Sequence, residues 1–288
     1  MNGHLASYIL FLLAEQATLA VQLHYPWMNF DALSHHLHLP SGVSKVVIGR
    51  YPLPALLPGS SGPPDSPLIW GITLSGSERV IRWVGDELTR MLCGGATNAQ
   101  LAGVRELWLA DVSPAPCDEP HILRAAEANQ VRAIIQDMSS LETVVLVNQF
   151  QAPWTGAPPS LRLLPNAREG ERHVGPRPSM VRIAHGYGKH VLQRWSERPD
   201  PTPAVPALDL TGVLEELASG AYDYVRNVVI EVPYHVAVDA GDIERLREHC
   251  DTVQVKVVDV TPAISLPAYC YESAAWAAND VPWPYKLW

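Results

Sequence analysis

The chain has 288 residues, of which 47% are hydrophobic and 18% charged, so it is long enough to bury a sizeable core, and wholesale disorder is not expected. The formal net charge of -9, with no Lys/Arg block longer than two residues, argues against a nucleic-acid binder and against a polybasic membrane surface. The four cysteines lie far apart without a C-x-x-C pair, which favours a reduced intracellular protein over a disulfide scaffold or a cysteine-based metal site.

The N-terminal region contains a short apolar run, Leu5–Ala14. Glu15 and Gln16 interrupt this run well before the roughly 20 residues that a membrane span needs. We therefore predict an N-terminal helical segment over residues 1–30, with its helix over Leu5–Leu23, and no membrane association. A signal or an anchor is the alternative for this run.

Two β-like runs follow, Val43–Ile48 and Ile69–Leu74, and a loop rich in Pro, Gly and Ser separates them. The next segment, Ser77–Gly95, carries apolar residues at helical spacing from Val80 to Leu92. With Ser77 as its N-cap and the glycines at its end, this segment predicts a helix.

Strands and helices alternate through the rest of the chain. We predict a strand within 104–112, a helix from Asp118, a strand over 141–150, a helix between Asp209 and Gly220, a strand over 224–232, a helix capped by Asp239 or Asp242, and a last strand over 253–260. Residues 151–207 are rich in Pro and Gly and predict an irregular insertion, with short apolar pieces at Leu161–Leu164 and Met180–Ile183. This order favours an α/β layout with parallel strands.

One strand template recurs: an apolar residue, two others, an apolar residue, one other, and a third apolar residue. It fits the runs that begin at Val43, Ile69, Val104, Leu141 and Val225. "SLRLLPN" adds Leu161-x-Leu163-x-x-Asn166, the L-x-L-x-x-N core of a leucine-rich repeat. We therefore predict a single repeat-like α/β domain over 1–288, an irregular leucine-rich-repeat-like array with a curved, mostly parallel sheet and helices on the other side. An ordinary doubly wound α/β domain is the alternative.

The strongest copies of this pattern carry a family resemblance. "LAGVRELWLADV", a helix and then "MSSLETVVLVNQ" resemble the degenerate leucine-rich-repeat region of large fungal (basidiomycete-type) F-box proteins. "LSHHLHLPSGVSKVVI" and the helix–strand–helix–strand run ending in "VQVKVVD" are similar to other parts of that region, so the resemblance spans most of Leu33–Val260. It implies a repeat fold and a role as the substrate-binding half of a ubiquitin-ligase component.

The F-box itself, which would dock on the ligase adaptor, is not recognisable. Such a module is helical and opens with Leu-Pro and an acidic residue. Leu39-Pro40 and Leu53-Pro54 are not followed by that pattern. Adaptor binding is therefore not part of what the resemblance implies here.

Motifs for catalysis or cofactor binding are weak. His35, His36 and His38, with His24 nearby, have no carboxylate or cysteine at ligand spacing, so we expect no metal site. "AHGYGKH" is too short for a phosphate-binding loop, and neither a G-x-S-x-G elbow nor a strand-linked G-x-G-x-x-G occurs. We predict no catalytic residues, no metal and no cofactor.

The C-terminal tail, residues 262–288, is aromatic and rich in proline. Its aromatic residues would either form a buried cap on the array or an exposed protein-binding patch. The candidate protein-binding residues are Tyr271, Trp276, Trp283, Tyr285 and Trp288.

The sequence thus favours a non-enzymatic protein-protein interaction scaffold, cytoplasmic or nuclear, whose strand-lined or loop face binds another protein. The alternative is a hydrolase-like α/β enzyme with a pocket near His185, Tyr187 and Lys189.

Overall fold

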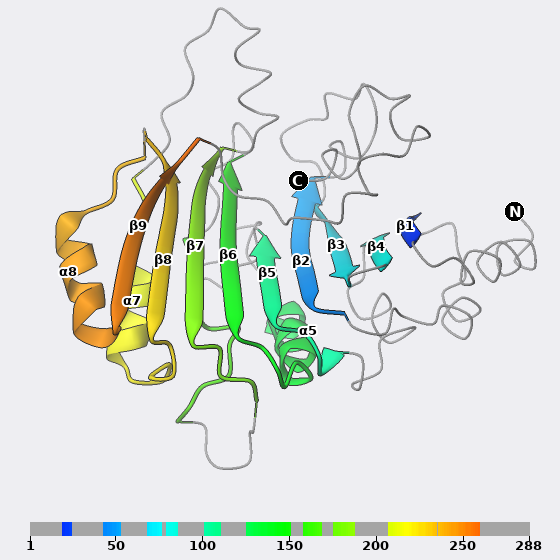
Figure 1. The fold of residues 1–288 in the computed structure, drawn as a ribbon, viewed down its shortest axis with the longest axis horizontal. Coiled ribbons are helices and arrows are strands. Elements are labelled where there is room, and N and C mark those ends of the chain that lie inside the picture. The colour runs from blue at the N-terminus through cyan, green and yellow to red at the C-terminus, as the bar shows by residue number, and fades with distance from the viewer. Residues whose placement is uncertain are drawn as a thin grey trace, which may run out of the picture. The chain divides into compact units, whose positions relative to one another are not determined.

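The computed structural model describes residues 19–24, 43–52, 68–76, 79–85, 101–110, 125–150, 158–168, 175–187, 207–234 and 236–259 (Figure 1). The chain forms two compact units. The first holds the described residues up to Arg105 together with Met138–Ser140, and the second holds the other described residues between Glu106 and Ala263. No helix in these ranges is long and apolar enough to cross a membrane.

The described residues of the first unit include four strands. They are β1 (Leu19–His24), β2 (Lys45–Pro52), β3 (Leu68–Ser75) and β4 (Arg79–Gly85). Strand β3 pairs antiparallel with both β2 and β4, and β1 pairs parallel with β4. The runs at Val43 and Ile69 are thus neighbouring strands of opposite direction, not successive parallel copies of one repeat.

Two of the helices predicted here are wrong where the structure describes the chain. Arg79–Gly85 is a strand, because Val80, Ile81 and Val84 are β-branched and β3 supplies a partner along their whole length. Leu19–His24, within the predicted N-terminal helical segment 1–30, is also a strand. Leu5–Ala14 and the other residues before Leu19 lie outside the described ranges.

The second unit alternates strands and helices, as predicted. Its elements are β5 (Glu106–Ala110), α5 (Ala125–Gln136), β6 (Thr143–Phe150), β7 (Met180–Tyr187), α7 (Thr211–Ala218), β8 (Asn227–Pro233), α8 (Ala240–His249) and β9 (Thr252–Val258). All five strands are parallel, and each pairs with its neighbour in the chain. The α/β class and the mostly parallel sheet are confirmed.

The three described helices lie on one side of these five strands: in Figure 1, α5 and α7 are seen behind the sheet, and α8, which contacts α7, is seen at its left edge. Each strand is added on the same side of the preceding one, and a right-handed crossover then places every connecting helix on the same face. We call this face the helical side and the opposite face of β5–β9 the helix-free side.

The register explains why the helical side is buried from β5 to β8. Equivalent positions of the five strands are aliphatic and form two rows. The first row is Leu107, Val144, Val181, Val228 and Val253, and the second is Leu109, Leu146, Ile183, Ile230 and Val255. Helix α5 buries Ala128, Val131 and Ile135 at helical spacing, as expected for a face that packs on such rows.

The helix boundaries follow from local hydrogen bonds. Asp239 is the N-cap of α8, as predicted, and its Oδ1 accepts from the N–H groups of Gly241 and Asp242 at 2.7 and 3.1 Å. Before α7, Asp209 accepts from the N–H of Thr211, which lowers the pKa of the Asp209 carboxyl. Gly220 has φ 70° after α7, a conformation that favours glycine, so the helix ends there.

The predicted irregular insertion over 151–207 contains one of the central strands. Met180–Tyr187 is β7, and it pairs with β6 on one side and β8 on the other. The L-x-L-x-x-N match at Leu161 is not a strand but a turn, in which the N–H of Leu164 donates to Leu161 O at 2.8 Å. That assignment to a repeat strand is therefore wrong.

Candidate functional site

The helix-free side of β5–β9 presents the strand positions between the aliphatic rows. Because side chains alternate along a strand, these positions face away from the helices. They form three rows across the strands. The rows are Glu106, Thr143, Met180, Asn227 and Thr252; Trp108, Val145, Arg182, Val229 and Gln254; and Ala110, Val147, Ala184, Glu231 and Lys256.

An arginine links three of these strands. Nε and Nη2 of Arg182 on β7 donate to both carboxylate oxygens of Glu231 on β8, at 2.8–3.2 Å. The Arg182 guanidinium carbon also lies 5.5 Å from the ring centroid of Trp108 on β5, within cation–π range. The indole N–H of Trp108 donates to Glu106 on the same strand.

This network fixes an arginine and an aromatic ring in one place. Val145 stands between Trp108 and Arg182 in the register and is fully buried, as expected if the stacked pair passes over it. The side chain of Glu231 is 8% exposed and that of Arg182 is 24% exposed. Arg182 therefore keeps access to solvent while its orientation is held by a buried carboxylate.

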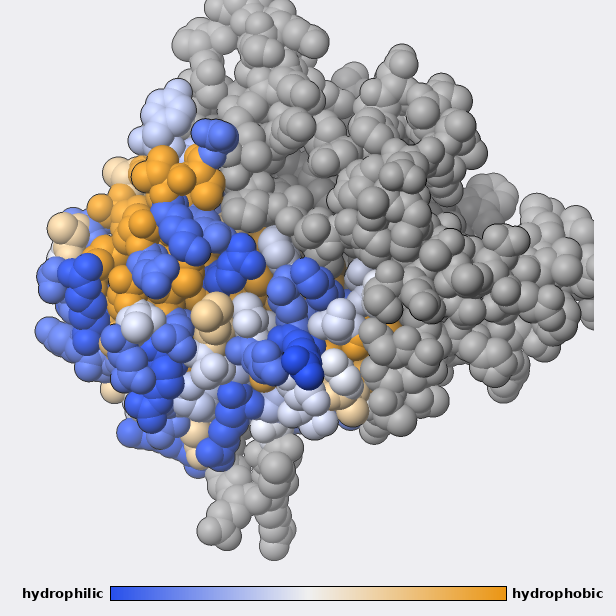
Figure 2. Space-filling model, in the orientation of Figure 1, coloured by the Kyte–Doolittle hydropathy of each residue, from blue (hydrophilic) through white to orange (hydrophobic). Residues whose placement is uncertain are grey.

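Toward β9 the same side becomes polar and open. Thr252 donates its hydroxyl to Asn227 Oδ1 at 2.6 Å, across β8 and β9. Gln254 and Lys256 are both exposed. Figure 2, viewed from this side, shows hydrophilic residues grouped with hydrophobic ones beside them. A surface that combines cationic, amide and hydroxyl groups can recognise another protein by several kinds of contact.

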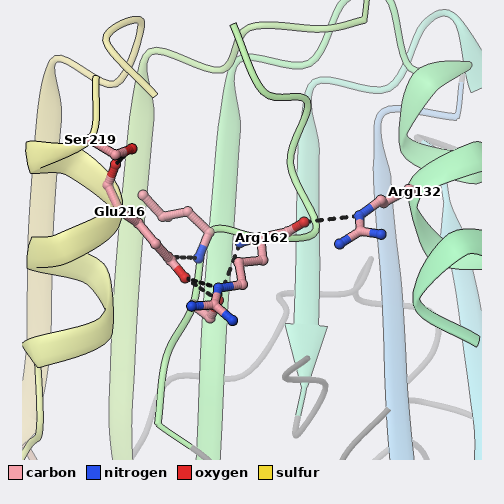
Figure 3. Close-up of polar contacts among 6 residues, drawn as sticks. Arg132, Arg162, Glu216 and Ser219 are labelled. Carbon is pink, nitrogen blue, oxygen red and sulfur yellow. Dashed lines mark hydrogen bonds and ion pairs between the residues drawn. The ribbon is translucent and has the colours of Figure 1, made fainter. Parts of the chain in front are cut away.

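A second feature lies on the helical side, between α5 and α7 (Figure 3). It is a cleft of about 560 Å³, and the turn that follows Leu161 forms its floor. The residues that line it are Asn129, Arg132, Gln136, Arg162, Leu163, Leu164, Pro165, Asn166, Glu215, Glu216, Ser219, Ala221 and Tyr222. All of them belong to the second unit.

Glu216 holds the floor of this cleft in place. Its carboxylate accepts from the Ser160 hydroxyl at 2.7 Å, the Leu161 N–H at 2.5 Å and Nε of Arg162 at 3.1 Å. Burial of this side chain raises the pKa of Glu216, although the three donors act in the opposite direction. All three hydrogen bonds that the Glu216 carboxylate accepts here come from the turn, so its role is to hold the turn in place.

The other end of the floor is anchored to the segment after α7. The Tyr224 hydroxyl donates to Pro165 O at 2.7 Å, and the Ala167 N–H donates to Ala221 O at 2.8 Å. Burial raises the pKa of Tyr224. Because both ends of the floor are tied to α7 or its C-terminal turn, the cleft is formed before any ligand enters.

Arg132 is oriented by neutral acceptors. Its Nε donates to Arg162 O at 3.0 Å, a contact drawn in Figure 3, and its Nη1 donates to Asn129 Oδ1 at 2.9 Å. Arg162 meets Glu216 through Nε and its side chain is 45% exposed. Glu216 is thus the ion-pair partner of Arg162, whereas Arg132 has no ion-pair partner in the described part of the chain.

The structure describes only part of the pocket predicted for an enzyme. His185 lies on β7 and is buried at 4% exposure on the helical side, beside Asn148 of β6. Tyr187 is the last residue of β7, and Lys189 lies outside the described ranges. The enzyme alternative stays a prediction that no geometry described here supports.

Other candidate residues are also outside what the structure describes. These are Tyr271, Trp276, Trp283, Tyr285 and Trp288 of the tail, and His35, His36 and His38. His24 is the last residue of β1. Within the described ranges, no group of three or more His, Cys, Asp or Glu side chains could hold a metal ion.

Sequence reasoning missed the residues that define both features. Arg182 and Glu231 are 49 positions apart, and Arg162 and Glu216 are 54 apart. The first pair could have been found by aligning the strands in register, because the alignment places Trp108, Arg182 and Glu231 on one face. Recognising it required β7, which the sequence did not predict as a strand.

Comparisons of the chain with protein-family models, curated proteins and solved structures found no match.

Proposed function

We propose that this protein is a non-enzymatic scaffold that binds another protein through the helix-free side of β5–β9. The observation that carries the proposal is Arg182, which Glu231 holds in orientation and which is 24% exposed, together with the exposed Gln254 and Lys256 on a face that the three helices leave uncovered. An arginine side chain in a fixed orientation is a typical anchor of protein interfaces.

The proposal includes a degenerate leucine-rich-repeat-like architecture for the second unit. The template of three apolar positions fits all five of its strands in register. Its first position is occupied by Val104, Leu141, Pro178, Val225 and Cys250, and each of these residues is buried. The strands begin at residues 106, 143, 180, 227 and 252, so the spacing varies between 25 and 47 residues.

In this architecture one face of each strand packs against the helices, and the other face is the proposed binding surface. The aliphatic positions bury the core against the helices, so their chemistry is restricted. Several of the positions between them, such as Trp108, Val145 and Ala184, are buried as well. The positions on β9 are exposed and carry hydroxyl, amide and charged groups. Repeat arrays use such sheet surfaces for binding.

We extend the proposal to the kind of partner. The resemblance to fungal F-box proteins supports a substrate-receptor-like role, in which the bound protein is a degradation target. Removing this protein from cells should then raise the abundance of the partner, and restoring it should reverse the change. Unchanged turnover of an identified partner would contradict this extension while leaving the scaffold proposal intact.

Site-specific photocrosslinking tests the binding face. A benzophenone amino acid is placed at Gln254, exposed on the helix-free side, and for comparison at Glu248, exposed on α8. We expect a discrete adduct with one partner from position 254 and none from position 248. Equal adducts from both positions would overturn the assignment of the face.

Affinity for the captured partner provides the second test. Gln254→Arg changes size and charge on the proposed face without touching the core, and Glu248→Arg is the matched control on α8. We expect at least a tenfold loss of affinity for the first variant, about 1.4 kcal/mol, and no loss for the second. Unchanged affinity of Gln254→Arg would contradict the proposal.

A further inference from the structure

We propose that the cleft between α5 and α7 is a second binding site, which takes a carboxylate side chain of an extended acidic peptide segment. The cleft lies on the helical side, so this site is separate from the face assigned above, and the inference goes beyond the proposed scaffold function.

Charge is the first argument. Arg132 and Arg162 both line the cleft, and the backbone carbonyl of Arg162 accepts from Arg132, so the two residues are in direct contact. The one carboxylate that pairs with Arg162 is Glu216, which is already saturated by three donors. In the described part of the chain, Arg132 contacts only neutral acceptors, so its charge remains uncompensated.

Geometry is the second argument. Arg132 uses Nε and Nη1 for its contacts, which leaves Nη2 to donate into the cleft. Arg162 uses Nε, which leaves both terminal nitrogens of a side chain that is 45% exposed. A carboxylate between these groups would accept several charge-assisted hydrogen bonds from guanidinium groups that are already oriented.

The walls favour a peptide over a small anion. The α5 wall offers amides at Asn129 and Gln136, and the opposite wall offers the exposed carboxylate of Glu215. Donors on one side and an acceptor on the other suit a peptide backbone, which carries both N–H and C=O groups. A volume of about 560 Å³ also exceeds what a single inorganic ion needs.

Glu215 limits the charge that the cleft accepts. A dense polyanion would place negative groups near this carboxylate as well as near the arginines. One carboxylate on Arg132, with the peptide backbone continuing past Glu215, avoids that repulsion. The inference is therefore restricted to a peptide with an isolated acidic residue.

The experiment uses the full chain labelled with ¹⁵N-arginine, in which the side-chain Nε–H signals report on each guanidinium. The Arg132 signal is assigned by its absence in Arg132→Lys. The probes are a capped Gly-Ser-Gly-Glu-Gly-Ser-Gly peptide, the same peptide with Gln in place of Glu, and inorganic phosphate. We expect a saturable shift of the Arg132 signal with the Glu peptide and at least a fivefold weaker response with the Gln peptide.

A pair of charge variants on α5 separates binding from folding. Gln136→Glu adds a carboxylate to the cleft, whereas Ala133→Glu adds one to an exposed position that does not line it. We expect the first variant to weaken binding of the Glu peptide at least fivefold and the second to leave it unchanged.

Three results would overturn the inference: equal responses to the Glu and Gln peptides, a shift with phosphate alone, or full binding by Gln136→Glu. Each would leave the helix-free side untested by this experiment, because crosslinking from Gln254 is measured separately. Loss of crosslinking from Gln254 with intact peptide binding would in turn contradict only the scaffold proposal.

Discussion

Glu216 stabilises a turn that covers part of the sheet where no helix is described. Between β6 and β7 the described part of the helical side has a turn, and this turn buries Leu161, Leu163 and Leu164. Its backbone has no helical hydrogen-bond ladder, so its donors need an acceptor from elsewhere. Glu216 on α7 supplies it.

The cost of removing that acceptor can be predicted. Glu216→Ala leaves the Leu161 N–H and the Ser160 hydroxyl without their partner in a buried place. We expect the free energy of unfolding to fall by about 1–3 kcal/mol, measured by denaturant titration. Glu215→Ala, an exposed neighbour on the same helix, is the control, and an equal effect of both changes would contradict this role.

The same residue predicts a pH dependence. Burial raises the pKa of Glu216 above its ordinary value of 4.5, so the folded state binds this proton more tightly than the unfolded state. The contribution of Glu216 to stability therefore falls as pH rises from 4.5 through the raised pKa. Glu216→Gln removes this fall, and unfolding midpoints at a series of pH values should show a flatter profile for the variant. Parallel profiles would contradict the shift.

Removing the N-cap Asp239 is predicted to cause a smaller loss of stability. Its carboxylate accepts from two N–H groups in the first turn of α8. Asp239→Ala should lower the free energy of unfolding by about 1 kcal/mol, within the range known for N-caps. Thermal or chemical unfolding measures this, with Glu248→Ala on the same helix as the control. A null effect would mean that water replaces the cap without loss.

At the scale of elements, the strand template makes its own prediction. Leu107 is fully buried in the first aliphatic row, whereas Arg105 is exposed just before β5. Leu107→Asp buries a charge where no partner is available, so we expect loss of about 4 kcal/mol or complete unfolding, and Arg105→Ala should preserve the fold. Circular dichroism with thermal melts decides between these outcomes, and unchanged stability of Leu107→Asp would contradict the assignment of β5.

The alternation of strands and helices in the second unit could be predicted because its signals are local. Asp239 before α8 and Gly220 after α7 mark helix ends in the sequence itself. The aliphatic positions of β5, β6 and β8 recur at a spacing that a strand requires. These features do not depend on contacts with distant residues.

The elements that were mispredicted depend on such contacts. Arg79–Gly85 carries apolar residues that fit a helix as well as a strand, and pairing with β3 decides the outcome. Strand β7 contains Arg182 and His185, which break the apolar pattern, and it becomes recognisable only when the register aligns it with β6. Pro178 was likewise overlooked as a member of the template because it is not a typical repeat residue.

Neither candidate site could be predicted, for the same reason. The Arg182–Glu231 pair and the Arg162–Glu216 pair each join segments that are about 50 residues apart. The residue types alone do not predict these ion pairs, since an isolated Arg or Glu in a sequence is usually a solvated surface residue. Only the order of the strands brings them together.

At the scale of the whole second unit, stability should decline toward one end. β6 and β7 are paired on both sides, and residues 144–148 of β6 are all buried. β9 ends the row of strands, and every one of its residues is exposed or half-exposed, including Val255 at 45% and Val257 at 69%. A unit in which each strand contacts only its neighbours loses its ends first.

Hydrogen exchange measured by mass spectrometry tests this gradient. We expect amides of β9 and α8 to exchange at least tenfold faster than those of β6 and β7. The amides of β7 serve as the internal reference. Uniform protection from β5 to β9 would contradict a neighbour-by-neighbour arrangement and would favour a single cooperative core.

The order of the strands also bears on how such a protein can change over generations. Each of β6 to β9 pairs only with strands adjacent to it in the chain, so none of these strands must find a partner across an intervening copy. A duplication that copies one strand together with its connection would add a neighbour without breaking any existing pair. Strand-to-strand spacings between 25 and 47 residues show that the connections tolerate wide differences in length. We expect homologous chains to differ by whole strand-and-connection copies more readily than by rearrangement of those already present.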